Sequence, residues 1–223
     1  TKAEAEKVRM QEAVPLSQNE MYYLYNQYKD PANRKSFEAK FGPEYERIMA
    51  EITDGLKPKV KEFADWQVNE FFPELYEYYN EVYKSIYRTN MPWNVHYAGR
   101  IYREGVESEP INLLGEGNTY NTSVGTSSTK ARANSNKPIQ TMDGTNALMS
   151  YLGDMEYFAA YAETIRDINK LFTNEYIKSS IQNIYGKSTY TLIDNAIKNI
   201  AAKGRRGDIS DKFITGMNST FIV

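Results

Sequence analysis

Apolar side chains recur three or four positions apart along most of the first ninety residues, which is the spacing of one face of an α-helix. The first such run follows Ser17 and Glu20, whose order predicts a capping box at a helix start. Proline and glycine residues divide the later runs, so we predict several short helices rather than one long helix. The apolar positions of the first run are Met21, Leu24, Tyr25 and Tyr28.

Pro73 stands between two of these runs, the first leading to Phe71 and Phe72 and the second continuing to Tyr87. Because proline lacks an N–H and its ring clashes with the preceding helical turn, it should either kink one long helix or start a new one. Tyrosines after it fall on one stripe, for which packing in a core or an interface is the favoured interpretation. This stripe contains Tyr76, Tyr79, Tyr83 and Tyr87.

The helical period returns in the second half of the chain. Asp143 is placed to cap a helix that runs to Phe172, a rod of about 45 Å at 1.5 Å per residue. Asn174 and Ser188 are placed to cap two further helices, the first of which Gly186 would end. We therefore predict an all-α, multi-helix fold in the form of an elongated bundle.

The helical period is lost between these two halves. Residues 105–142 are rich in Gly, Ser, Thr and Asn and can bury little apolar surface, so we predict a long exposed polar loop or arm. The segment leading into it has one short extended stretch at 100–102. We expect three parts in total: an N-terminal helical part (1–104), the loop, and a C-terminal helical part (143–223).

Composition and charge limit the possible functions more than they change the fold. Hydrophobic residues make up 41% of the chain and charged residues 25%, which is typical of globular proteins. The net charge of −2 argues against a general nucleic-acid coat. With no cysteine and one histidine, the chain cannot form disulfides, thiolate metal sites or a zinc site with two histidines, and we expect no cofactor. No run approaches the roughly 18 apolar residues that span a bilayer.

The densest aromatic stretch surrounds the only histidine, His96. It makes this region the candidate interaction site or junction, which consists of Trp93, His96, Tyr97, Arg100 and Tyr102. A general base needs an orienting partner and a substrate pocket, and no spacing in this stretch matches a known catalytic arrangement. We therefore interpret His96 as a packed or hydrogen-bonded loop residue and expect no catalytic residue.

Two groups of charged residues were weighed as further sites. Lys130, Arg132 and Lys137 give the polar loop a local positive balance and are candidates for contact with nucleic acid or an acidic protein, although three charges are weak support. Three glutamates follow Pro73 at helical spacing and could in principle perform acid–base chemistry. A solvated helix face is the favoured interpretation for these glutamates, which are Glu74, Glu77 and Glu81.

The order of these elements resembles that of very large virion proteins of tailed bacteriophages, the internal or ejected "polyvalent" type. The stretch "ELYEYYNEVYKSIYRTNMPWNVHYAGRIYRE" is similar to a segment of those proteins in which a helix ends before an extended aromatic stretch. Lys130, Arg132 and Pro138 take places comparable to a basic pair and proline ahead of the family's long helix. "LMSYLGDMEYFAAYAETI" and "IKSSIQNIYG" resemble that helix and the shorter one after it.

The resemblance covers most of residues 60–223, and the first sixty residues carry little of it. It departs from the family where Ala98-Gly99 stands in place of a proline. The frequent Asn, Ile, Lys and Tyr would fit an AT-rich phage genome, for instance a crAss-like one. The chain starts without methionine and stops inside the apolar run "FITGMNSTFIV", from which we expect a piece of a longer polypeptide.

The resemblance implies a non-enzymatic structural or interaction segment, carried as cargo in the capsid or tail and delivered with the genome. Its partners would be other virion proteins or other parts of the same large polypeptide. It would lie inside the virion and could reach the host cell. Two alternatives remain open: a helical carbohydrate- or peptide-binding protein that uses a Tyr/Trp surface, and an enzyme fragment with a site near His96.

Overall fold

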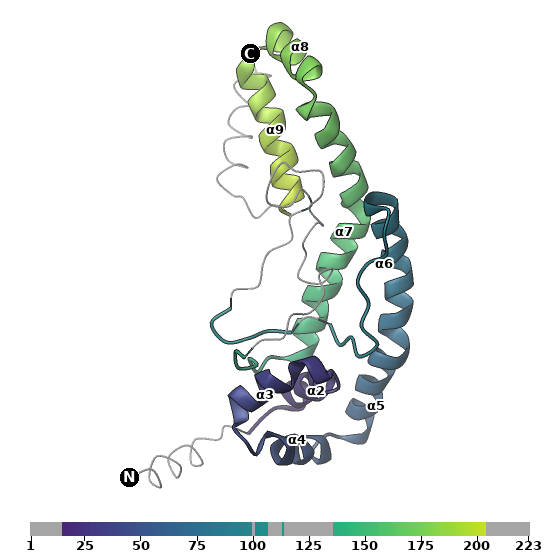
Figure 1. The fold of residues 1–223 in the computed structure, drawn as a ribbon, viewed down its shortest axis with the longest axis vertical. Coiled ribbons are helices and arrows are strands. Elements are labelled where there is room, and N and C mark those ends of the chain that lie inside the picture. Colours follow the sequence, from purple (N-terminus) through teal and green to yellow (C-terminus); the bar gives the residue numbers. More distant parts are fainter. Residues whose placement is uncertain (1–14, 100, 107–112, 114–135, 204–223) are drawn as a thin grey trace, which may run out of the picture.

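The computed structural model describes residues 15–99, 101–106, 113 and 136–203. Within these ranges the chain is helical and contains no strand, which confirms the all-α, multi-helix fold. Figure 1 shows an elongated molecule in which the long helix α7 forms a spine. Short N-terminal helices gather around one end of α7, α6 lies along its side, and α8 and α9 stand at the other end.

The N-terminal helices begin and end close to where the sequence predicts. Ser17 caps the first of them: its hydroxyl accepts from the Glu20 N–H at 3.2 Å, and its own N–H donates to the Glu20 carboxylate at 2.8 Å. A 3₁₀ turn at Pro31–Asn33 separates the first two helices. The helices are α2 (Gln18–Tyr28), α3 (Arg34–Phe41), α4 (Tyr45–Asp54) and α5 (Pro58–Trp66).

Pro73 does not interrupt the helical backbone. A π-helical turn, η2 (Gln67–Phe71), joins α5 directly to α6 (Phe72–Tyr87), and the Phe72 N–H donates to the Gln67 carbonyl. The wider π turn lies immediately before the proline, where an ordinary α-helical turn would press its ring against the carbonyl four residues earlier. Pro73 thus lies in the first turn of α6, which agrees with a helix started by the proline, and η2 joins this helix to α5 without a break.

The predicted tyrosine stripe on α6 faces the spine of the molecule. Tyr79 and Tyr83 are buried, and the Tyr79 hydroxyl donates to the Glu156 carboxylate of α7 at 2.7 Å. The Tyr83 ring lies 6.3 Å from that of Phe158. These tyrosines are core residues whose hydroxyl groups reach polar partners or the surface, as their half-apolar chemistry favours.

The second half forms α7 (Gly144–Thr173), α8 (Glu175–Tyr185) and α9 (Lys187–Ala201). Asp143 caps α7 as predicted, since its side chain accepts from the Asn146 N–H at 2.9 Å. Asn174 caps α8 through its contacts with the next two N–H groups. The predicted cap at Ser188 is wrong: α9 begins one residue earlier, and Gly186 serves as both the end of α8 and the N-cap of α9.

Two apolar residues within the predicted polar loop are buried, although Gly105, Val106 and Lys137 near its ends are exposed as predicted. Ile139 is fully buried, and its N–H donates to the Ser36 carbonyl at 3.0 Å. Arg103, one residue beyond the predicted extended stretch, forms an isolated antiparallel bridge with Ile139, and the Gln140 N–H donates to the Tyr102 carbonyl at 3.0 Å. Leu113 is also buried, and its N–H donates to the Ala201 carbonyl at 2.9 Å. Most of the loop lies outside the described residues.

The helix α7, first in the predicted C-terminal part, contributes to two separate buried clusters that include helices of the predicted N-terminal part. Its first turn packs against α2 so closely that a Cβ on Gly144 would lie 2.2 Å from Cδ1 of Tyr22. Its middle packs against α6 and α9, where Met155, Phe158 and Ile165 are buried. Asp143 therefore marks the start of a helix, and this helix packs against segments that come before Asp143 in the chain.

Candidate functional site

The aromatic junction after α6 folds back along that helix. Tyr76 donates from its hydroxyl to the Met91 carbonyl at 2.8 Å, and the Met91 N–H donates to the side chain of Asn80 at 2.7 Å. Trp93 lies with its ring centroid 4.4 Å from that of Tyr76 and remains 39% exposed. The predicted exit segment is thus held by hydrogen bonds and ring contacts to the helix it leaves.

His96 lies in the turn of this segment and is exposed. Its N–H donates to the side chain of Asn94 at 2.9 Å, while its imidazole makes no hydrogen bond or ion pair with the described residues. Asn94 in turn donates to the Asp30 carboxylate at 2.8 Å, which ties the segment to the end of α2. Of the two predicted forms, a packed or a hydrogen-bonded loop residue, His96 takes the second: its backbone is hydrogen-bonded and its side chain is exposed.

Tyr97 lies inward of the histidine and meets three other rings. Its ring centroid is 5.4 Å from Phe72, 5.6 Å from Tyr151 and 6.2 Å from Trp93. Gly99 follows with a φ of 75°, a backbone conformation that L side chains rarely adopt. Glycine suits this turn, where the resemblance leads one to expect a proline.

The remaining predicted site residues do not converge on the histidine. Tyr102 donates its N–H to the Tyr23 hydroxyl at 2.7 Å and lies against α2. Lys137 donates to the Gly105 carbonyl at 3.3 Å. Arg100, Lys130 and Arg132 lie outside the described residues, so the proposed arm contacts stay a prediction.

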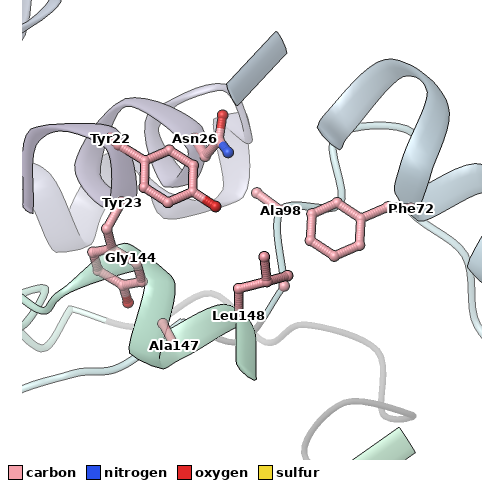
Figure 2. A pocket seen from close by; sticks show the side chains of 9 residues that line it. Tyr22, Tyr23, Asn26, Phe72, Ala98, Gly144, Ala147 and Leu148 are labelled. Carbon is pink, nitrogen blue, oxygen red and sulfur yellow. The ribbon is translucent and has the colours of Figure 1, made fainter. Parts of the chain in front are cut away.

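A small pocket lies where the junction meets α2 and the start of α7. Figure 2 shows Tyr22, Phe72 and Leu148 closing around it beside Ala98. The pocket has a volume of about 10 Å³. That is about the space one water molecule requires, far below the roughly 300 Å³ at which small-molecule sites begin. The pocket can hold a water but cannot receive a substrate.

A polar cluster between α2 and α5 was not predicted from the sequence. The Tyr22 hydroxyl and the Asn26 amide both donate to the buried Gln67 side chain. The Asp65 carboxylate accepts from the Tyr25 hydroxyl at 2.8 Å and from the Lys29 ammonium at 2.7 Å. Only the polar residues within the otherwise apolar α2 could have hinted at this cluster.

Burial and charge shift the pKa values in this cluster. Burial raises the pKa of Tyr22 to about 12, and burial together with the Asp65 carboxylate raises the pKa of Tyr25 to about 12. Burial also lowers the pKa of Lys29, against the opposing effect of Asp65. Burial alone would raise the pKa of Asp65, but hydrogen bonds from Lys29 and Tyr25 hold it below its usual value. Both tyrosines are therefore neutral at pH 7, and the cluster ties α2 to α5.

No group of three or more metal-ligating side chains gathers among the described residues. Within the same part of the chain, no helix is both long and apolar enough to cross a membrane.

Exposed apolar side chains, in contrast, are frequent on the outer helices. On α8, Tyr176 is 80% exposed and Ile184 is 71% exposed, and no residue of this helix is buried. On α5, Phe63 is 44% exposed and Trp66 is 40% exposed. Contiguous apolar patches on a protein surface mark contacts with other macromolecules more often than chemistry.

Comparison with models of protein families, with curated proteins and with solved structures finds no match to this chain.

Proposed function

We propose that the chain is a non-enzymatic structural or interaction segment of a large virion protein of a tailed bacteriophage, held in the capsid or tail and delivered with the genome. The interaction part of this proposal rests on a contrast within the chain: its pocket is very small, whereas large apolar side chains are exposed on its surface. The pocket at the aromatic junction has the volume of one water molecule. Large apolar side chains are meanwhile exposed on α5, α6 and α8.

The phage part of the proposal rests on the resemblance in the order of elements. The helix α6, its aromatic exit segment and the long helix α7 occur in the order found in the ejected virion proteins. A helical module without cysteine could unfold in a narrow channel and refold afterwards without any disulfide exchange. Its partners would be other virion proteins or other parts of the same polypeptide.

Mass spectrometry of purified virions tests this proposal. We expect peptides of this chain in virions of the phage that encodes it, and their loss from virions that have ejected their DNA. Absence of the parent protein from intact virions would contradict the phage part. A turnover by the purified chain that His96→Ala abolishes, with unchanged stability, would support the enzyme alternative instead.

The carbohydrate- or peptide-binding alternative is favoured by one specific observation. The exposed rings of Phe63 and Trp66 are stacked on one another at 5.8 Å, and Trp66 is stacked on Phe71 at 5.0 Å. In a column of this kind the ring faces lie largely against each other, so mostly ring edges remain for a sugar to contact. This arrangement favours a peptide over a carbohydrate as the ligand. A glycan array without hits would agree with this preference.

A further inference from the structure

The outer face of α5, η2 and α6 carries a continuous apolar seam. Phe63 and Trp66 are about two-fifths exposed, and Tyr78 is 51% exposed. Phe71, Leu75 and Val82 are half-buried, because they also pack against the core beneath. Figure 1 shows these helices at one edge of the molecule. We define the outer seam as Phe63, Trp66, Phe71, Leu75, Tyr78 and Val82.

The π-helical turn keeps this seam on one face. Its members are three or four positions apart, as in a coiled-coil seam, except for the five positions from Trp66 to Phe71. In an α-helix that step would rotate the seam away from its face, but η2 contains the extra residue of a π turn. The rings of Trp66 and Phe71 consequently stack at 5.0 Å with 27° between their planes. The seam thereby continues over about 30 Å at 1.5 Å per residue.

A row of carboxylates borders the outer seam on one side. The residue directly before each seam member is acidic in every case. Before Trp66 it is Asp65, which is paired with Lys29. The other five are exposed and form no ion pair with the described residues; they are Glu62, Glu70, Glu74, Glu77 and Glu81. These five unpaired carboxylates make the electrostatic potential beside the outer seam more negative.

This charge pattern discriminates among the surfaces that could cover the seam. Nucleic acid and anionic membranes would be repelled by the row of glutamates. A second copy docked through the same face would bring five further carboxylates into the contact. A helix with basic side chains beside its apolar positions would satisfy both the seam and the carboxylates.

We propose that the outer seam is a docking site for a basic amphipathic helix of another polypeptide. The inference deepens the interaction part of the proposed function and is independent of its phage part. The partner helix needs about 20 residues to cover the seam. It carries apolar residues at alternating spacings of three and four, with Lys or Arg on the side that meets the glutamates.

A synthetic peptide pair provides the first test with the 223-residue chain. Both peptides have 21 residues with leucine at heptad positions; one carries lysine at the flanking positions and the other glutamate. Fluorescence anisotropy of the labelled peptides gives their dissociation constants. We expect the lysine peptide to bind at least about tenfold more tightly, with the difference shrinking as salt is added. Equal binding of the two peptides would overturn the proposal.

Variants of the chain then locate the site. Replacing Glu74, Glu77 and Glu81 together by Gln should weaken the lysine peptide about five- to tenfold, the effect of losing three exposed ion pairs. The matched control replaces Glu44, Glu51 and Glu175 by Gln, which changes the net charge equally but lies elsewhere. An equal effect of both triple variants would show a general charge attraction and contradict a local site.

A tyrosine pair tests the apolar part. Tyr78→Ser should weaken binding about fivefold or more, whereas Tyr176→Ser on α8 should leave it unchanged, provided that both variants keep the urea midpoint of the parent chain. Sedimentation equilibrium of the chain alone gives the remaining outcome. If the chain dimerises and Tyr78→Ser abolishes the dimer, the partner is a second copy and our assignment is wrong. None of these results depends on whether the parent protein occurs in virions.

Discussion

The middle of α7 and the helix α8 both carry apolar side chains at helical spacing but bury them very differently. Around Phe158, α7 is covered by α6 on one side and by α9 on another, and Met155, Phe158 and Ala162 are buried there, whereas Tyr161 on the open side is 45% exposed. α8 packs mainly against α9 and the end of α7, and none of its residues is buried. Because hydrophobic stabilisation follows the apolar area removed from water, the two helices should differ in how much they stabilise the fold.

The largest expected effect tests this difference directly. Phe158→Ala removes a fully buried ring and should lower the free energy of unfolding by about 3–5 kcal/mol. Tyr176→Ala removes a ring that is 80% exposed and should change it by about 0.5 kcal/mol or less. Urea unfolding followed by circular dichroism measures both. Similar losses for the two variants would remove the distinction between the regions.

Two glycines of α7 allow a covered and an open position to be compared by adding one methyl group to each. Gly144→Ala forces a Cβ into the ring of Tyr22 and should cost about 1–3 kcal/mol. Gly153→Ala meets only the Lys203 ammonium at 3.5 Å and should stabilise the helix by up to about 1 kcal/mol. Thermal melts of the two variants should therefore shift in opposite directions. A stabilised Gly144→Ala variant would mean that α2 and α7 can separate at no cost.

Alkaline pH should loosen the α2–α5 end. The folded pKa of Tyr22 is raised to about 12 from an unfolded value of 10, so its stabilising contribution is complete below pH 10 and is lost as pH rises to 12. In the Tyr22→Phe variant the urea midpoint should decrease less between pH 10 and pH 12 than in the parent chain. The lost hydrogen bond should lower the midpoint by a constant amount at every pH. A slope that Tyr22→Phe leaves unchanged would contradict this prediction.

The smallest expected effect concerns the cap of α8. Asn174 accepts from the N–H groups of Tyr176 at 3.0 Å and Ile177 at 3.3 Å. Asn174→Ala should cost about 1 kcal/mol locally. Because α8 contributes little to the core, we expect faster hydrogen exchange in α8 with almost no change in α7. Equal acceleration in both helices would show that the two regions unfold together.

Local signals in the sequence predicted much of the fold. Ser17, Asp143 and Asn174 cap helices where their side chains come directly before an apolar run, because a cap depends on residues within one turn. The cap at Ser188 failed because Gly186 already ends one helix and starts the next. Pro73 left two outcomes open, and the π turn that resolves them depends on packing beyond the local sequence.

The candidate site was predicted less completely. The aromatic junction follows from the lost helical period after Tyr87, but its contacts with α2 and α7 join residues that are far apart in the chain. The buried group around Gln67 lacks a local motif, since it needs α2 and α5 to lie side by side. The sequence assigned Ile139 to a polar loop because the apolar surface that covers this residue is formed by other segments of the chain.

By itself the sequence determined the all-α class, the helix starts and the amphipathic faces, because these depend on hydrogen bonds and side-chain spacings within a few residues. Only the tertiary structure decided which apolar faces are covered. Tyr79 and Tyr78 are neighbours on α6, yet one is fully buried against α7 and the other is half exposed on the outer seam. The physical reason is that burial depends on what lies opposite a face, and no local pattern contains that information.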